Sequence, residues 1–331
     1  MGIINRNNLP RIMTKKSTYT FDYPQAIEFA ESQRAVFWEP TEIQVEKDVQ
    51  DMMVNMTPAE RHGIITTLKL FTLYELEIGT EYWNGIVCKM FPRPDIIQMA
   101  NCFGFFEMNV HAPFYNKINE ALMINTDEFY ESYLDDPELA QRMEFVEEMA
   151  ASKDRMLSLA VFSMMEGAIL YSSFAFLKHF QNRGKNYMTN VCAGIGYSAR
   201  DENLHSEGGA WLFRTAIDEI QPKHDDLMEL YDKIIEAAHK LREHEFQIVD
   251  KIFEHGKIDG ITDKQLKNFV DSRINLMLSN LGVGRLEELE HKYNPIAEWF
   301  YDGINMIQFN DIFATKGNEY HRSWDESSFS W

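Results

Sequence analysis

The 331-residue sequence is 45% apolar, and its 52 acidic residues outnumber its 32 basic residues, which gives a net charge of −20. This apolar content is enough for a sizeable core, and one bundle of long helices could use most of the length. Because so negative a surface repels phosphate backbones, the charge excludes nucleic acid as an expected partner.

The hydrophobic pattern predicts helices along nearly the whole chain. The expected helices span, in chain order, residues 40–56, 57–90, 95–123, 126–149, 154–180, 187–217, 222–255 and 262–281, with a short one after 294–295. The clearest helix start is the capping box Thr57-Pro58-Ala59-Glu60, and FPRP at 91–94 is the clearest break. Residues 1–35 are polar and are expected to form an irregular arm. Strand signals are weak, so the prediction is all-α, with four core helices of 25 or more residues.

Two features predict a soluble protein of the cytoplasm. Residues 157–177 are apolar and long enough to cross a bilayer, but Glu166 at their centre would cost roughly 3 kcal/mol at mid-membrane. A helix buried inside a soluble protein is therefore favoured. Cys88, Cys102 and Cys192 share no CxxC spacing, which suggests neither a zinc site nor a disulfide framework. With no signal peptide in the sequence, this predicts a reducing compartment.

The long helices carry acids and histidines inside their apolar stretches. The six candidate metal ligands are, in chain order, Glu75, Glu107, His111, Glu166, Glu202 and His205. Residues three or four apart share a helix face, so Glu107 pairs with His111, and Glu202 pairs with His205. Two such pairs and two single carboxylates from four helices can hold two metal ions. Oxygen and nitrogen donors together suit iron or manganese.

Each candidate has a simpler explanation when it is taken alone, because Glu-His pairs are common on helix surfaces and core histidines are common. Burying several unpaired carboxylates together would be prohibitive without cations, so the whole set predicts a metal site. Glu77 and Glu81 are alternatives to Glu75, but they lie less deep in the apolar run. Asp201 is expected to accept a hydrogen bond from a ligand histidine, because its neighbour Glu202 faces about 100° away on a helix.

Several segments together resemble the small subunit of class I ribonucleotide reductases. They are Phe37-Trp38-x-Pro40, His111 followed four residues later by Tyr115, ARDENLH at 199–205, and Asn294-Pro295-Ile296. The resemblance implies an N-terminal arm over 1–35, a ferritin-like four-helix bundle with additional helices over 36–305, and a flexible tail over 306–331. It also implies a homodimer that works with a large subunit to reduce ribonucleotides to deoxyribonucleotides.

The resemblance further implies a role for individual residues. The six candidate ligands would bind two metal ions, and Tyr115 would be oxidised to a tyrosyl radical beside them. Trp38 and Asp201, with His111, would form the buried end of a radical-transfer path. Tyr320 would be the relay near the large subunit, which the last residues of the tail would bind. Five phenylalanines could keep water from the radical, although core packing alone also explains them: Phe103, Phe105, Phe106, Phe114 and Phe162.

Two departures from the family pattern leave questions open. The family usually spaces its second-helix ligands as Glu-x-x-His, whereas Glu107 and His111 are separated by one residue more. A π-bulge could absorb the insertion, and Pro113 could also distort this helix. The first-helix ligand is often Asp, whereas this sequence has Glu75, as members with a manganese/iron pair do. Those members tend to lack the radical tyrosine, but this sequence keeps Tyr115. We therefore expect di-iron first, with manganese/iron and dimanganese as open alternatives.

Two other functions remain as alternatives at this stage. A stand-alone ferritin-like dimetal oxidase or oxygenase would use the same ligands, but it would not need Trp38 or the tyrosine in the tail. Iron storage, or a purely structural role, is the non-enzymatic alternative. Storage proteins use shorter chains that assemble into cages, so this sequence favours it least.

Overall fold

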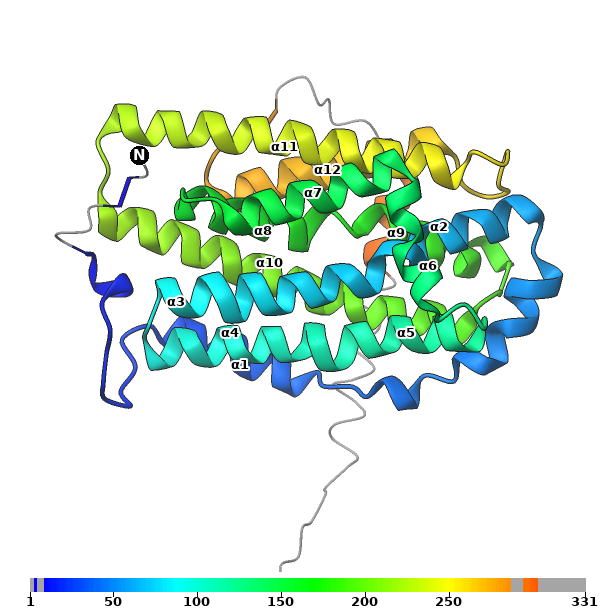
Figure 1. The fold of residues 1–331 in the computed structure, drawn as a ribbon, viewed down its shortest axis with the longest axis horizontal. Coiled ribbons are helices and arrows are strands. Elements are labelled where there is room, and N and C mark those ends of the chain that lie inside the picture. The colour runs from blue at the N-terminus through cyan, green and yellow to red at the C-terminus, as the bar shows by residue number, and fades with distance from the viewer. Residues whose placement is uncertain (1–2, 5–8, 287–293, 303–331) are drawn as a thin grey trace, which may run out of the picture.

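The computed structural model describes residues 3–4, 9–286 and 294–302, and its regular elements in this part of the chain are helices (Figure 1). The longer α-helices are α1 (Pro24–Ala35), α2 (Pro58–Glu77), α4 (Pro94–Phe106), α5 (Ala112–Ala121), α7 (Pro137–Ala151), α8 (Arg155–Ala168), α9 (Tyr171–Lys178), α10 (Thr189–Ile220), α11 (His224–Ile252) and α12 (Asp263–Leu281). Residues 295–302 are helical as well. The predicted all-α class is confirmed.

Four long helical stretches form the core and run along the same axis (Figure 1). The first is α2, which continues through the π-helical η5 (Ile78–Val87) into α3 (Cys88–Met90). The second is α4, which continues through the π-helical η6 (Glu107–His111) into α5. The third and fourth, α8 and α10, pack against each other, and α4 packs against η5. This arrangement is the ferritin-like bundle that the sequence predicts.

The starts of the helices follow from local sequence. The Thr57 hydroxyl accepts from the Glu60 backbone N–H, and the Glu60 carboxylate accepts from the Thr57 backbone N–H, so the predicted capping box is present. Thr262 and Gln265 form a second capping box at the start of α12. Asp154 accepts from the Leu157 backbone N–H and so caps α8. These caps fix where the core helices begin.

The apolar segment that resembles a membrane span lies in the centre of the bundle. Residues 155–182 form one helical stretch that is apolar enough to cross a membrane, and the most apolar part of it is fully buried. The stretch is α8 followed by α9, with a break at Ile169–Leu170. A helix with this burial is the core helix of a soluble protein, as predicted.

The N-terminal region differs from the prediction. Residues 24–35 are not irregular but form α1, because Ala26, Ala30 and Gln33 make a buried stripe that packs on α4. Residues 40–56 are not one α-helix: the 3-10 turn η2 (Pro40–Glu42) is separate, and the 3-10 η3 (Val45–Asp48) runs on into the π-helical η4 (Asp51–Asn55). Asp48 in η3 accepts hydrogen bonds from the Asn190 side chain and the Val191 backbone N–H, so it also caps the start of α10.

Two further differences concern the outer parts of the chain. Residues 126–149 form two helices, α6 (Asp127–Glu131) and α7, because the Asp136 side chain accepts from the Leu139 backbone N–H and starts α7 afresh. The tail at 306–331, with Tyr320, lies outside the described residues. The predicted division into arm, bundle and tail therefore stays a prediction.

Candidate metal centre

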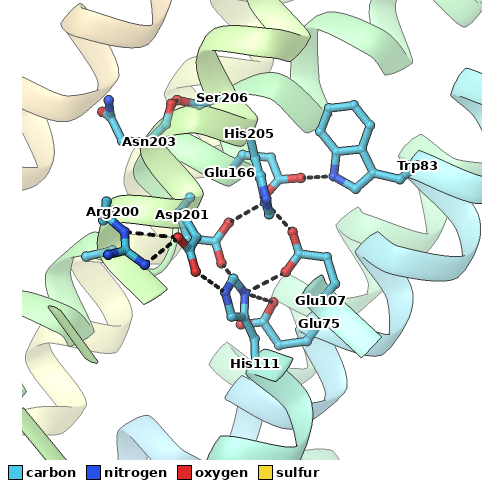
Figure 2. A network of polar contacts seen from close by, with 12 residues as sticks. Glu75, Trp83, Glu107, His111, Glu166, Arg200, Asp201, Asn203, His205 and Ser206 are labelled. Carbon is cyan, nitrogen blue, oxygen red and sulfur yellow. Dashed lines mark hydrogen bonds and ion pairs between the residues drawn. The ribbon is translucent and has the colours of Figure 1, made fainter. Parts of the chain in front are cut away.

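All six candidate ligands meet in the middle of the bundle, and Figure 2 labels each of them except Glu202. Each side chain is buried, with an exposed fraction of 3% or less. Their ligand atoms form two overlapping groups, within each of which all atoms lie inside 4.8 Å of one another. We call them the His111 half (Glu75, Glu107, His111, Glu202) and the His205 half (Glu107, Glu166, Glu202, His205).

Glu107 and Glu202 belong to both halves and present one oxygen to each. His111 Nδ1 lies 2.8 Å from Glu107 Oε2 and 3.0 Å from Glu202 Oε1. His205 Nδ1 lies 2.5 Å from Glu107 Oε1 and 3.4 Å from Glu202 Oε2. These two carboxylates are thus oriented to bridge two ions.

Glu75 and Glu166 each reach only one half. Glu75 Oε2 lies 3.9 Å from His111 Nδ1, and Glu166 Oε2 lies 3.8 Å from His205 Nδ1. Each half therefore has one histidine, one terminal carboxylate and a share of both bridging carboxylates. This is the donor set of a carboxylate-bridged dimetal site.

The extra residue between Glu107 and His111 is absorbed by a π-helical segment. The structure has η6 over Glu107–His111, as the sequence analysis considered, and both side chains reach the centre. Met108 is displaced against the neighbouring helix, where a Cβ on Gly79 would lie 2.6 Å from Met108 Cγ. Gly79 thus provides the space for the bulge. Pro113 lies in the first turn of α5, directly after the π-helical segment.

The electrostatics of the cluster require positive charge. Burial raises the pKa of Glu75 and of Glu166 well above the ordinary value, and neighbouring glutamates raise it further. Burial lowers the pKa of His205, but the charge of Glu107 and the hydrogen bonds to Glu107, Glu166 and Glu202 together outweigh this effect and raise it well above the ordinary value. Four carboxylates with neutral histidines carry four negative charges, which two divalent ions would neutralise.

Unpartnered atoms provide a test of whether metal ions fit. Glu75 Oε1 accepts no hydrogen bond within the described part of the chain, and the two oxygens of Glu202 face the ligand histidines. A buried oxygen without a donor is costly, so Glu75 Oε1 needs a partner that the described protein groups do not supply. The donor chemistry, the bridging geometry and the charge all fit two metal ions.

Asp201 lies beside the cluster, where the sequence places it. Its Oδ2 accepts from Trp38 Nε1 at 2.8 Å and lies 3.2 Å from His111 Nε2. Arg200 Nε donates to the other oxygen at 3.2 Å, as Figure 2 shows. These contacts hold the pKa of Asp201 below its ordinary value against burial, which raises it. A continuous chain of contacts therefore joins Trp38 to His111.

Tyr115 is fully buried in an aromatic environment. Its phenol has no hydrogen-bond partner among the described residues, and its ring centre is 4.6 Å from that of Phe71. Burial raises the pKa of this phenol well above its ordinary value, and the charge of Glu75 adds to the effect. Four of the five phenylalanines named above are buried, whereas Phe105 is 46% exposed and cannot exclude water.

Two alternative ligands from the sequence do not reach the metal centre. Glu81 is exposed and Glu77 is partly exposed, so neither replaces Glu75.

One contact of the centre was not predicted from the sequence. The indole N–H of Trp83 donates to Glu166 Oε1 at 2.5 Å. The only signal for Trp83 is its position eight residues after Glu75, about two helical turns along the same stretch.

The fold and the buried carboxylate–histidine cluster define a ferritin-like protein of the dimetal-carboxylate class. Residues 15–295 match the family model described as "Ribonucleotide reductase, small chain", and the chain belongs to this family. It is the small subunit of an oxidoreductase, and the resemblance seen in the sequence is confirmed.

Relatives in sequence agree with the family. The chain is 23% identical to the probable ribonucleoside-diphosphate reductase small subunit 048L of Invertebrate iridescent virus 3, over 97% of this chain and 88% of the relative. It is 27% identical to the ribonucleoside-diphosphate reductase subunit beta of Treponema pallidum, over 87% of this chain and 82% of the relative.

Solved structures share the fold. A putative class I ribonucleotide reductase from Bacillus halodurans superposes with a TM-score of 0.75 at 20% identity, covering 85% of this chain and all of that one. Dimanganese(II)-NrdF from Streptococcus sanguinis gives 0.75 at 22% identity, covering 88% of this chain and 99% of that one.

Proposed function

We propose that the chain generates the oxidising equivalent with which a large subunit reduces ribonucleoside diphosphates. The observation that carries this proposal is the contact chain from Trp38 through Asp201 to His111, which links a buried indole outside the ligand set to a candidate ligand. A stand-alone oxidase would not need such a link. Two sequence relatives that align over most of this chain are described as ribonucleoside-diphosphate reductase subunits, which supports the diphosphate substrate.

In this proposal two metal ions are held by the six residues of the His111 and His205 halves. When bound, such a pair activates oxygen and supplies an oxidising equivalent to the protein. We expect iron at both positions first, and manganese/iron or dimanganese are the alternatives. A dimanganese(II) form is named for the Streptococcus sanguinis structure, so the metals of this chain need direct measurement.

Tyr115 is the residue that we expect to hold the radical. Its raised pKa means that the phenol keeps its proton until the ring is oxidised. Its surroundings, which include Phe71 and Phe114, exclude water, and this protects a radical once it has formed. Trp38 and Asp201 would then pass the oxidising equivalent from the metal centre toward the large subunit.

The partner proposals rest on the family alone. We expect a homodimer whose tail, residues 306–331, binds the large subunit, with Tyr320 as the relay between the two. The tail and Tyr320 lie outside the described residues.

The three cysteines are unpaired thiols, which supports a reducing compartment such as the cytoplasm.

The experiment is electron paramagnetic resonance on protein loaded with iron or manganese and exposed to dioxygen. We expect a tyrosyl radical in the wild type, none in Tyr115→Phe, and an undiminished one in Trp38→Phe. Trp38→Phe should instead lose ribonucleotide reduction with the large subunit, because only transfer is interrupted. A tyrosyl signal that survives in Tyr115→Phe would contradict the assignment of Tyr115.

A further inference from the structure

Trp83 makes a contact with the candidate metal centre that has no counterpart in the His111 half. It lies in η5, and its indole Nε1 donates to Glu166 Oε1 at 2.5 Å (Figure 2). The side chain has no exposed surface. An indole N–H buried this deeply needs an acceptor, because leaving it unpaired is costly.

The indole ring is held in place by its aromatic neighbours. Its centre lies 4.9 Å from that of Phe103, almost perpendicular to it, and 4.5 Å from that of Tyr82. The imidazole of His205 lies edge-on at 6.1 Å. Because side chains from different helices fix the ring, Trp83 cannot easily follow a movement of Glu166. The direction of the N–H bond instead fixes the carboxylate.

We propose that Trp83 is a positioning residue that keeps Glu166 a ligand through one oxygen. Because the indole N–H occupies one lone pair of Oε1 and fixes the carboxylate, Oε2, on the side of His205 Nδ1, is the oxygen presented to an ion in the His205 half. This inference rests on the metal ligands of the proposed function. It makes the His205 half depend on a hydrogen bond that lies outside the six ligands.

The His111 half is built differently. In its terminal carboxylate, Glu75, Oε1 accepts no hydrogen bond from any described residue, and Oε2 lies 3.9 Å from the ligand His111 Nδ1, so no indole holds the oxygen that Trp83 holds in Glu166. The tryptophan on that side, Trp38, donates to Asp201 and not to a ligand. The two tryptophans thus form a matched pair. Each donates an indole N–H to a buried carboxylate, but only Trp83 touches a proposed ligand.

The test is an anaerobic Mn²⁺ titration of the full-length protein, with free ion counted by electron paramagnetic resonance. The wild type should bind two ions per chain. Trp83→Phe removes the N–H. The affinity for one of the two ions should fall about 10–100-fold, and the affinity for the other should not change. Trp211→Phe, a control tryptophan on α10 that packs on Phe29, should bind both ions as the wild type does.

The outcomes separate this inference from the proposed function. If the wild type binds no ions, the proposed function fails. If the wild type binds two and Trp83→Phe binds two with unchanged affinity, the role of Trp83 is overturned. Crystals of the Mn²⁺-loaded wild type give a second measurement that does not depend on the folding of a variant. Glu166 should bind through one oxygen with the other on Trp83, and binding through both oxygens would also overturn the inference.

Discussion

Glu245 and the glutamates of the candidate metal centre are buried in the same bundle, but they have different partners. Glu245, on α11, is fully buried, and its carboxylate lies 2.7 Å from Arg142 Nη1 on α7. Ser172 donates to its second oxygen at 2.5 Å. Arg142 also donates to the Tyr74 hydroxyl at 2.6 Å. This carboxylate has its counter-charge within the protein.

The six candidate ligands of the metal centre do not balance their charges among themselves. Four glutamates share two histidines, so two negative charges remain even when all four carboxylates are ionised and both histidines are protonated. The comparison shows that burial alone does not indicate a metal ligand. A buried carboxylate whose charge is balanced by protein groups is structural. A group of buried carboxylates whose charge the protein does not balance indicates a metal site.

The largest expected effect of this difference is the response to metal removal. Chelation should lower the free energy of unfolding of the loaded wild type by about 4 kcal/mol per ion, if free metal was about 1,000 times its Kd. The physical reason is that the ions bind the folded cluster and not the unfolded chain. Urea denaturation of loaded and stripped protein measures the change.

Glu202→Ala is the control for this prediction because it removes a carboxylate shared by both halves. The stability of this variant should respond far less to chelation. If loaded and stripped wild type unfold at the same urea concentration, the metal centre contributes nothing to stability, and the contrast with Glu245 fails.

The sequence predicts the metal centre better than it predicts the pair of Glu245 and Arg142. Glu166 stands out because apolar residues surround it along the chain, and Glu202 and His205 stand out because a regular helix places them on one face. Glu245 lies in a strongly charged amphipathic helix, where a buried acid resembles its exposed neighbours. Its partner Arg142 is on another helix, so only tertiary packing identifies the pair.

The same reasoning explains the other differences between prediction and structure. The capping box at Thr57 is local, so the start of α2 could be predicted. The hydrogen bonds that tie Asp48 to the start of α10 join segments that are distant in the sequence, so a local pattern could not predict them. The contact between Trp83 and Glu166 likewise joins two helices, which is why the sequence did not identify it.

The next largest effect concerns Glu245 itself. Glu245→Leu should cost about 3–5 kcal/mol of stability, because it leaves the Arg142 guanidinium buried without its carboxylate. The metal content of this variant should stay at the wild-type level, because Glu245 belongs to neither half of the centre. Urea denaturation and metal analysis of the same preparation check both expectations.

A double variant sharpens this test. Arg142→Met combined with Glu245→Leu should cost less than Glu245→Leu alone, because no unpaired charge then remains. Additive costs in the two single variants would show that the pair is not coupled. Glu245 would then differ from the metal-site glutamates only in its position.

The smallest effect is a pH dependence that belongs to Glu245. Burial raises its pKa to about 7, against the opposing effects of Arg142 and Ser172. An unfolded glutamate loses its proton near pH 4.5, so between these values the folded chain binds more protons than the unfolded chain. The free energy of unfolding should therefore fall by about 3 kcal/mol as the pH rises through this window, and level off above it.

Glu245→Gln isolates this component because it keeps the shape of the side chain and removes the titration. Stability measured between pH 5 and pH 8, written as wild type minus variant, should fall with rising pH. Glu243→Gln, an exposed change on the same helix, should leave the wild-type profile unaltered. If the Glu245→Gln profile matches that of the wild type, Arg142 keeps Glu245 ionised throughout this window. The pair would then be fully compensated by its own charges, which would make the contrast with the metal centre sharper still.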